Sequence, residues 1–143
     1  MSAVRPLSAL HVINSISESE FDEAFATMGR LKVGAFLVST DPLFGFNGRG
    51  LHITMALPYG IPAICNGRVD AVAGGLVSYG ANLPDTWRQA GVYVGRILKG
   101  EKPSELPVVQ PTKFELVINL KAAKQLGIDI PPTLLTRADE VIE

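Results

Sequence analysis

Short apolar segments of this sequence are each followed by side chains that could bind a small polar molecule. These side chains supply hydroxyls, a carboxylate, an amide, a guanidinium and a phenol ring, and they are Ser39, Thr40, Asp41, Asn66, Arg68, Ser78 and Tyr79. The hydroxyls and Arg68 could hold a carboxylate, Asp41 could hold an ammonium group, and Tyr79 could stack on a ring or face a cation. The set therefore suits a zwitterion.

Each of these residues also has a purely structural explanation. Asp41 precedes Pro42, so its side chain could simply form an Asx-type turn. Ser78 and Tyr79 could do no more than close a turn, and Arg68 could be a solvated surface charge. The set suggests a ligand-binding site without specifying one.

The residues available for catalysis or metal binding are few. The two histidines, His11 and His52, and the single cysteine, Cys65, cannot assemble a structural zinc site at recognised spacings. A nucleophilic pair of Cys65 and His52 is conceivable in space, but no third group that would orient the histidine can be assigned. A lone cysteine is more often a small buried hydrophobe. We therefore expect no catalytic residue, no metal site and no cofactor.

The glycine-rich stretch 45–50 does not match a nucleotide-binding motif. Its glycines are ordered G-x-x-G-x-G, it lacks the GK[ST] that places a lysine on phosphates, and no G-x-G-x-x-G occurs in the chain. No G-x-S-x-G nucleophile elbow is present either. These patterns favour a binding protein over an enzyme.

Composition narrows the class of protein further. The chain has 143 residues, of which 47% are hydrophobic and 19% charged, so it can bury a core as one globular domain. A net charge of -1 offers no basic field for nucleic acid, and its weak repulsion makes self-association plausible. No apolar run reaches the length of a signal-peptide core or of the roughly 20 residues that span a bilayer.

The predicted elements alternate between helices and strands. A capping box of Ser17 and Glu20 opens the first helix, an apolar run at 35–39 indicates a strand covered on both faces, and Asn82 or Leu83 caps a helix that Gly100 stops. The first expected helix starts after Ser17 and is ended by Gly29 or Gly34. The other expected helices span 51–57, 83–98 and 120–126, and the expected strands lie at 35–39, 62–66, 73–80 and 114–119. After Pro131, one or two helical turns are expected.

Strand, helix and strand at this spacing indicate a right-handed βαβ unit. We predict a single α/β domain over 1–143, with a three-layer, mostly parallel sheet. In such sheets ligands bind outside the carboxyl ends of the strands, which is where the candidate ligand-binding residues are expected.

Several longer stretches carry a resemblance to a known family. They lie at 39–44, 57–62, 74–80, 82–85, 93–100, 110–120 and 137–143. In this order they resemble the ABC transporter substrate-binding protein family related to tryptophan- and tyrosine-binding lipoproteins, from about Ser17 to the end of the chain. The resemblance implies the type I periplasmic-binding-protein fold, in which two α/β lobes joined by crossing strands close on a small solute.

The resemblance also implies partners and a location. Such a receptor delivers its solute to a membrane permease outside the cytoplasm, and an aromatic or branched amino acid is the solute that the family suggests. The turns at Ser39–Asp41 and Ser78–Tyr79 would face the cleft between the lobes. A chain that truly starts at Met1 without a signal peptide would instead be cytoplasmic.

The resemblance implies that the sequence corresponds to the C-terminal lobe and crossing segments of such a receptor, without almost all of its N-terminal lobe. The helix 83–98 would normally pack on that lobe, so its apolar residues Trp87, Val94 and Leu98 would be uncovered. We expect two copies to bury these faces against each other as a homodimer. The alternative to an importer component is therefore a truncated, dimeric, cytoplasmic ligand-binding or scaffold module without a transport role.

Overall fold

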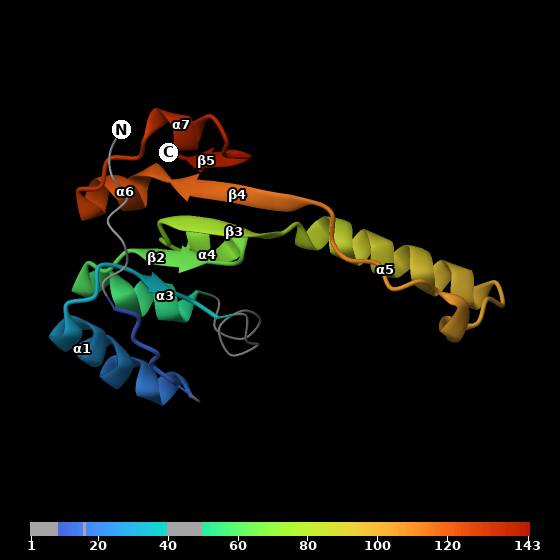
Figure 1. The fold of residues 1–143 in the computed structure, drawn as a ribbon, viewed down its shortest axis with the longest axis horizontal. Coiled ribbons are helices and arrows are strands. Elements are labelled where there is room, and N and C mark those ends of the chain that lie inside the picture. Colours follow the sequence, from blue (N-terminus) through green and yellow to red (C-terminus); the bar gives the residue numbers. More distant parts are fainter. Residues whose placement is uncertain (1–8, 16, 40–49) are drawn as a thin grey trace.

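The computed structural model describes residues 9–15, 17–39 and 50–143. In this part of the chain helices alternate with strands (Figure 1). The helices are α1 (Phe21–Leu31), α3 (Leu51–Ala56), α4 (Arg68–Val72), α5 (Leu83–Leu98), α6 (Leu120–Leu126) and α7 (Pro132–Leu135). The strands are β1 (Phe36–Leu37), β2 (Ala63–Cys65), β3 (Val77–Ala81), β4 (Phe114–Asn119) and β5 (Glu140–Ile142). Short 3-10 turns occupy Glu18–Glu20, Leu57–Tyr59 and Pro103–Glu105.

The five strands form one sheet in the order β1-β2-β3-β4-β5. β1, β2 and β3 run parallel, β4 runs antiparallel to β3, and β5 runs parallel to β4. The predicted α/β class with a mostly parallel sheet is confirmed. Because β4 is reversed, its first residue lies at the same edge as the carboxyl ends of β1 to β3.

One face of the sheet is covered by α3 and α4. Cys65 is paired with Ser78, which is paired with Val117, so these three side chains share a face. Ile53 of α3 packs into the core cluster that contains Cys65, and the Asn119 side chain donates a hydrogen bond of 2.8 Å to the backbone carbonyl oxygen of Ala71 in α4. The main core lies between this face and the two helices.

The opposite face of the sheet is covered over part of its width only. A registered row of apolar residues crosses it, from Leu37 through Ile64, Val77 and Ile118 to Val141. Val77 packs against the cluster formed with α6, whereas Leu37 is 75% exposed. The prediction that the run at 35–39 is covered on both faces is therefore wrong.

α5 extends away from the sheet as an arm, and the chain runs back along it towards β4 (Figure 1). Asn82 caps the helix as predicted, since its side chain accepts a hydrogen bond of 2.7 Å from the backbone N–H of Asp85. No residue of α5 is buried, because the arm has packing partners on few sides. In the described part of the chain, no helix is long and apolar enough to cross a membrane.

Several predicted boundaries are corrected by the structure. The Ser17 hydroxyl contacts the Ser19 hydroxyl at 2.9 Å rather than closing a capping box, so a 3-10 turn precedes α1. α1 ends at Leu31, and Lys32 rather than a glycine adopts the left-handed conformation, with φ of 51°. The helix α4 and the strand β5 were not expected from the sequence, because each is only a few residues long.

Candidate functional site

The candidate ligand-binding residues gather near the edge where β1, β2 and β3 end, except for two that fall outside the described residues. Ser39 follows β1 and is exposed, and Asn66 follows β2 and is half-buried. Thr40 and Asp41 lie outside the described part of the chain. Ser78 and Tyr79 lie inside β3, which begins at Val77, so the prediction that these two residues form a turn is wrong.

Gly80 allows β3 to pass closely beside the end of β2. A Cβ atom at this position would lie 1.9 Å from the backbone carbonyl oxygen of Asn66, a distance that no side chain tolerates. The absence of a side chain at Gly80 therefore allows the backbone after β2 to lie against β3. It fixes where Asn66 stands relative to the third strand.

Because successive side chains of a strand point to opposite faces of the sheet, Ser78 and Tyr79 lie on different faces. Ser78 faces the helices and is 1% exposed, while Tyr79 points to the other face and is 61% exposed. Within the described residues the Ser78 hydroxyl oxygen has no hydrogen-bond partner. A solute at the sheet edge can therefore reach the side chain of Tyr79 but not that of Ser78 in this conformation.

Tyr79 forms an exposed aromatic platform with Phe114, the first residue of β4. The two ring centroids lie 5.8 Å apart with an interplanar angle of 22°, and Phe114 is 50% exposed. Sequence reasoning did not single out Phe114, because only the antiparallel pairing of β3 with β4 brings it beside Tyr79. The platform offers a flat apolar surface of the kind that stacks on rings.

Arg68 is an exposed residue whose guanidinium is paired with a carboxylate, so it is not a free anion-binding group. Its Nε and Nη2 atoms donate hydrogen bonds of 2.6 and 2.8 Å to the two carboxylate oxygens of Glu140 in β5. These hydrogen bonds raise the pKa of Arg68 and lower the pKa of Glu140. A carboxylate on a solute would have to compete with the Glu140 carboxylate for Arg68. No pattern in the sequence singles out Glu140 as a partner of Arg68.

A polar cluster fixes the base of α5. The Asp85 carboxylate lies 2.9 Å from the Nη2 atom of Arg88 and 3.2 Å from the Nζ atom of Lys113. Hydrogen bonds from Arg88, Gln89 and Lys113 lower the pKa of Asp85 to about 2. The Asn82 side chain also donates a hydrogen bond to Glu115. The arm is thus anchored to both chain segments that connect it with the sheet.

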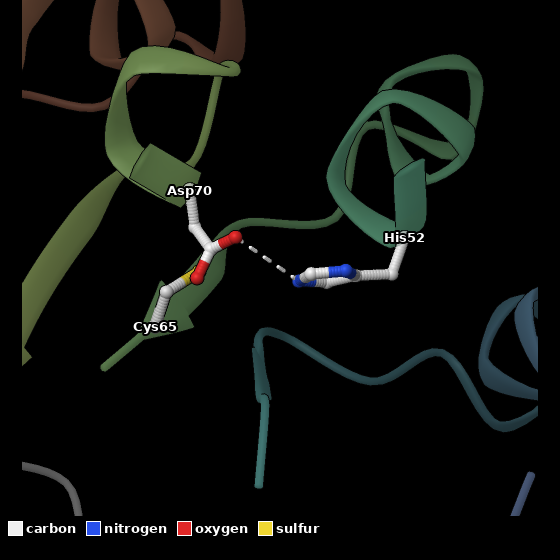
Figure 2. A group of neighbouring side chains, drawn as sticks. All are labelled: His52, Cys65 and Asp70. Atoms are coloured by element: carbon white, nitrogen blue, oxygen red, sulfur yellow. Dashed lines mark ion pairs between the residues drawn. The ribbon is translucent and has the colours of Figure 1, made fainter. Parts of the chain in front are cut away.

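A second cluster, of His52, Cys65 and Asp70, is buried between the sheet and the helices α3 and α4. The three side chains point toward one another from α3, β2 and α4 (Figure 2), and they are 2, 2 and 5% exposed. His52 Nε2 and Asp70 Oδ1 are 3.6 Å apart. The metal-binding atoms of the three residues all lie within 4.8 Å of one another. We refer to these residues as the buried triad.

Burial disfavours the charged forms of the groups in the buried triad. It raises the pKa of Asp70 and lowers the pKa of His52. Burial and the nearby Asp70 charge raise the pKa of Cys65 to about 12. The conceivable Cys65–His52 pair therefore exists in space, but its thiol keeps its proton and lies away from solvent, so it is a poor nucleophile. Asp70 was missed because the three residues come from three different elements.

Two hollows on the described surface lie away from the strand ends. One, of about 210 Å³, is lined along α5 and the returning chain by Thr86, Gln89, Ala90, Tyr93, Val109 and Pro111. The other, of about 290 Å³, is lined by Leu57, Gly60, Gly74, Ala122, Gln125 and Leu126. Neither includes a candidate ligand-binding residue.

Solved structures with a similar fold come from several bacteria. A conserved domain protein from Vibrio cholerae has a TM-score of 0.80 at 26% identity, with 89% of this chain and 42% of that chain covered. An ABC domain in complex with L-Trp from Streptococcus pneumonia has a TM-score of 0.79 at 29% identity, with 88% and 42% covered. A ligand-free, open substrate binding protein from Clostridium difficile has a TM-score of 0.58 at 22% identity, with 87% and 41% covered, and shows likeness of fold alone.

The match at the level of sequence spans nearly the whole chain. None of the curated proteins compared with the chain matches it. The model of a family described as ABC transporter substrate binding protein matches residues 11–142. The chain spans about 42% of the length of the first two similar structures. With this family match and the agreement in fold, the chain belongs to the ABC transporter substrate-binding protein family.

Proposed function

We propose that this chain contributes to the solute-binding component of an ABC-type importer. The observation that carries the proposal is the family match over residues 11–142. It is supported by the similar structure from Streptococcus pneumonia, which is in complex with L-Trp. In this proposal the chain supplies one side of the binding site. Its partners are a small solute, which it binds outside the cytoplasm, and a permease in the membrane.

The proposed solute lies at the edge formed by the ends of β1, β2 and β3. Tyr79 and Phe114 would stack on an apolar or aromatic part of the solute, and Asn66 would hydrogen-bond its polar part. The proposed set also includes Ser39, Thr40 and Asp41, which follow β1 in the sequence, and the Asp41 carboxylate is suited to an ammonium group. Arg68 would contribute by exchanging part of its bond with Glu140 for a solute carboxylate.

The proposed solute is a zwitterion with a flat or branched side chain, such as an aromatic amino acid. The exposed aromatic platform of Tyr79 and Phe114 supports this class, since binding sites combine apolar walls with a few placed polar groups. Ser78 is 1% exposed, so its proposed part in the site is to support the strand rather than to touch the solute.

The proposed function is tested by thermal unfolding of the full chain with single amino acids, L-Trp first. Binding to the folded state raises the unfolding midpoint by mass action. We expect Tyr79→Leu to remove the shift. Tyr59→Leu is the matched control, because Tyr59 is 42% exposed and lies just before β2, at the other end of the strand. Absence of any amino-acid shift in the unsubstituted chain would contradict the proposal.

The exposed face of α5 supports a second candidate function. Trp87, Val94 and Leu98 are 61, 56 and 83% exposed on this arm. In the receptor proposal another lobe packs on them. In the alternative, two copies of the chain pack these faces together, and the protein is a dimeric binding or scaffold module without a role in transport. The oligomeric state separates the two, as argued below.

A further inference from the structure

The buried triad points to a function separate from solute binding. Its metal-binding atoms lie within 4.8 Å of one another, and the His52–Asp70 pair is already at 3.6 Å. Neighbouring ligand atoms around a tetrahedral zinc ion are about 3.3–3.8 Å apart, so the side chains need to approach by only about 1 Å. We propose that His52, Cys65 and Asp70 bind one divalent transition-metal ion, with Zn²⁺ the best match.

The chemistry of the three donors favours zinc over other common ions. A thiolate sulfur, an imidazole nitrogen and a carboxylate oxygen are the atoms that zinc takes in proteins. Calcium and magnesium prefer oxygen ligands alone. A thiolate and a carboxylate together carry two negative charges, which a divalent cation neutralises. The loaded site is therefore uncharged overall, as an apolar interior requires.

Ser78 provides an independent observation at the same place. Its Cα atom pairs with that of Cys65 across neighbouring parallel strands, so the two side chains lie on the same face. The Ser78 hydroxyl oxygen is buried without a hydrogen-bond partner among the described residues. Buried polar groups of this kind call for a physical reason. Bound metal supplies one, because hydroxyls beside a metal site donate hydrogen bonds to its ligands.

The ion would join three elements of the fold. His52 belongs to α3, Cys65 to β2 and Asp70 to α4, so one ion ties both covering helices to the sheet. All three side chains are at most 5% exposed, which gives a substrate in solution no access to the metal. The proposed role is therefore structural.

Cobalt titration of the full chain tests the proposal. The protein is unfolded with chelator and reductant, then refolded with Co²⁺, so that burial of the site does not prevent loading. We expect one Co²⁺ per chain, a thiolate-to-cobalt charge-transfer band, and visible bands of a tetrahedral ion, with water as the fourth ligand, that Zn²⁺ abolishes. Because Cys65 is the only cysteine, this band identifies its sulfur as the ligand.

Substitutions then assign the remaining ligands. Cys65→Ser should remove the charge-transfer band, and His52→Gln and Asp70→Asn should each weaken cobalt binding by more than about 100-fold. Ser78→Ala should weaken it by about 10-fold. His11→Gln is the matched control, since His11 is the other histidine and is exposed, and it should bind cobalt unchanged.

Outcomes that overturn the proposal are distinct from failure of solute binding. A refolded chain without the charge-transfer band contradicts it, as does equal loss of binding in His11→Gln. Where a variant does not fold, X-ray absorption of the zinc-loaded natural chain decides instead. One sulfur and one imidazole around the ion support the proposal, and an ion held only by oxygen and surface nitrogen refutes it.

Discussion

Gly80 is the residue at which the spacing of the sheet edge is decided. An added Cβ atom would lie 1.9 Å from the Asn66 carbonyl oxygen and 2.9 Å from its carbonyl carbon. Both are backbone atoms, so relief requires β3 to move away from the end of β2. The same displacement would shift Asn66 and Tyr79, which we propose as solute contacts.

Gly80→Ala should therefore lower the free energy of unfolding by about 2–4 kcal/mol. Gly95→Ala is the matched control, because nothing lies within 4 Å of a Cβ atom at that position. Alanine favours a helix over glycine, so this control should be neutral or more stable by up to about 1 kcal/mol. Urea unfolding measures both values, and similar stabilities for the two variants would contradict the close approach.

The ion pair of Arg68 and Glu140 should make stability depend on acidity. The pKa of Glu140 is lowered from its usual value of 4.5 by the Arg68 hydrogen bonds. A carboxylate with a lowered pKa in the folded state stabilises the fold above its unfolded pKa, and this contribution is lost as the pH falls through the folded value.

Glu140→Gln should consequently flatten the decline of the unfolding midpoint below pH 4.5, the usual pKa value of this carboxylate. The control Glu143→Gln removes a carboxylate just beyond the end of the same strand and should keep the decline. Thermal unfolding monitored by circular dichroism at a series of pH values measures the slope. Identical slopes for the natural chain and Glu140→Gln would rule out this contribution.

At the scale of elements, two asparagines cap helices but differ in burial. Asn82 and Asn119 each accept a hydrogen bond from a backbone N–H in the first turn of the following helix, at 2.7 and 2.9 Å. Asn119 is 4% exposed and also links β4 to α4 through the carbonyl of Ala71. Removing it leaves buried polar groups without partners.

Asn82→Ala should cost about 1–2 kcal/mol, because it removes the N-cap and the partly buried hydrogen bond to Glu115. Asn119→Ala should cost about 2–4 kcal/mol, because the lost link adds to the lost cap. Asn119→Asp keeps the cap acceptor but places a buried carboxylate oxygen against the carbonyl oxygen of Ala71, so it should cost at least as much as the lost link alone. Chemical unfolding measures the differences. Equal costs for the two alanine variants would contradict a structural role of the Asn119 link.

The elements that sequence reasoning predicted well are those with a local signal. α5, α6 and β4 carry caps, glycine stops or a long apolar run, and they appear where expected. α4 and β5 were missed because α4 has no side-chain cap and β5 has only three residues. The stacking of Tyr79 on Phe114, the Arg68–Glu140 pair and the buried triad depend on strand order. No spacing along the chain encodes them.

At the scale of the whole molecule, the arm α5 is the surface through which we expect copies of the chain to associate. The exposed apolar residues of α5 do not contribute to the core. The net charge of the chain is -1, so electrostatic repulsion between two copies is weak. Packing the arms of two copies would remove Trp87 and Leu98 from water, which favours association at roughly 25 cal/mol for each Å² of apolar surface buried. Another lobe packed on the same face would compete with that dimer.

We therefore expect the isolated chain to dimerise through α5, and Trp87→Glu together with Leu98→Glu to make it monomeric. Val108→Glu is the control, because Val108 is 98% exposed and lies outside α5, so it should leave the dimer intact. Light scattering across a wide range of concentration measures the mass. A natural chain that stays monomeric throughout would refute the dimer. It would leave the arm as a surface for another lobe, which is the arrangement that the receptor proposal requires.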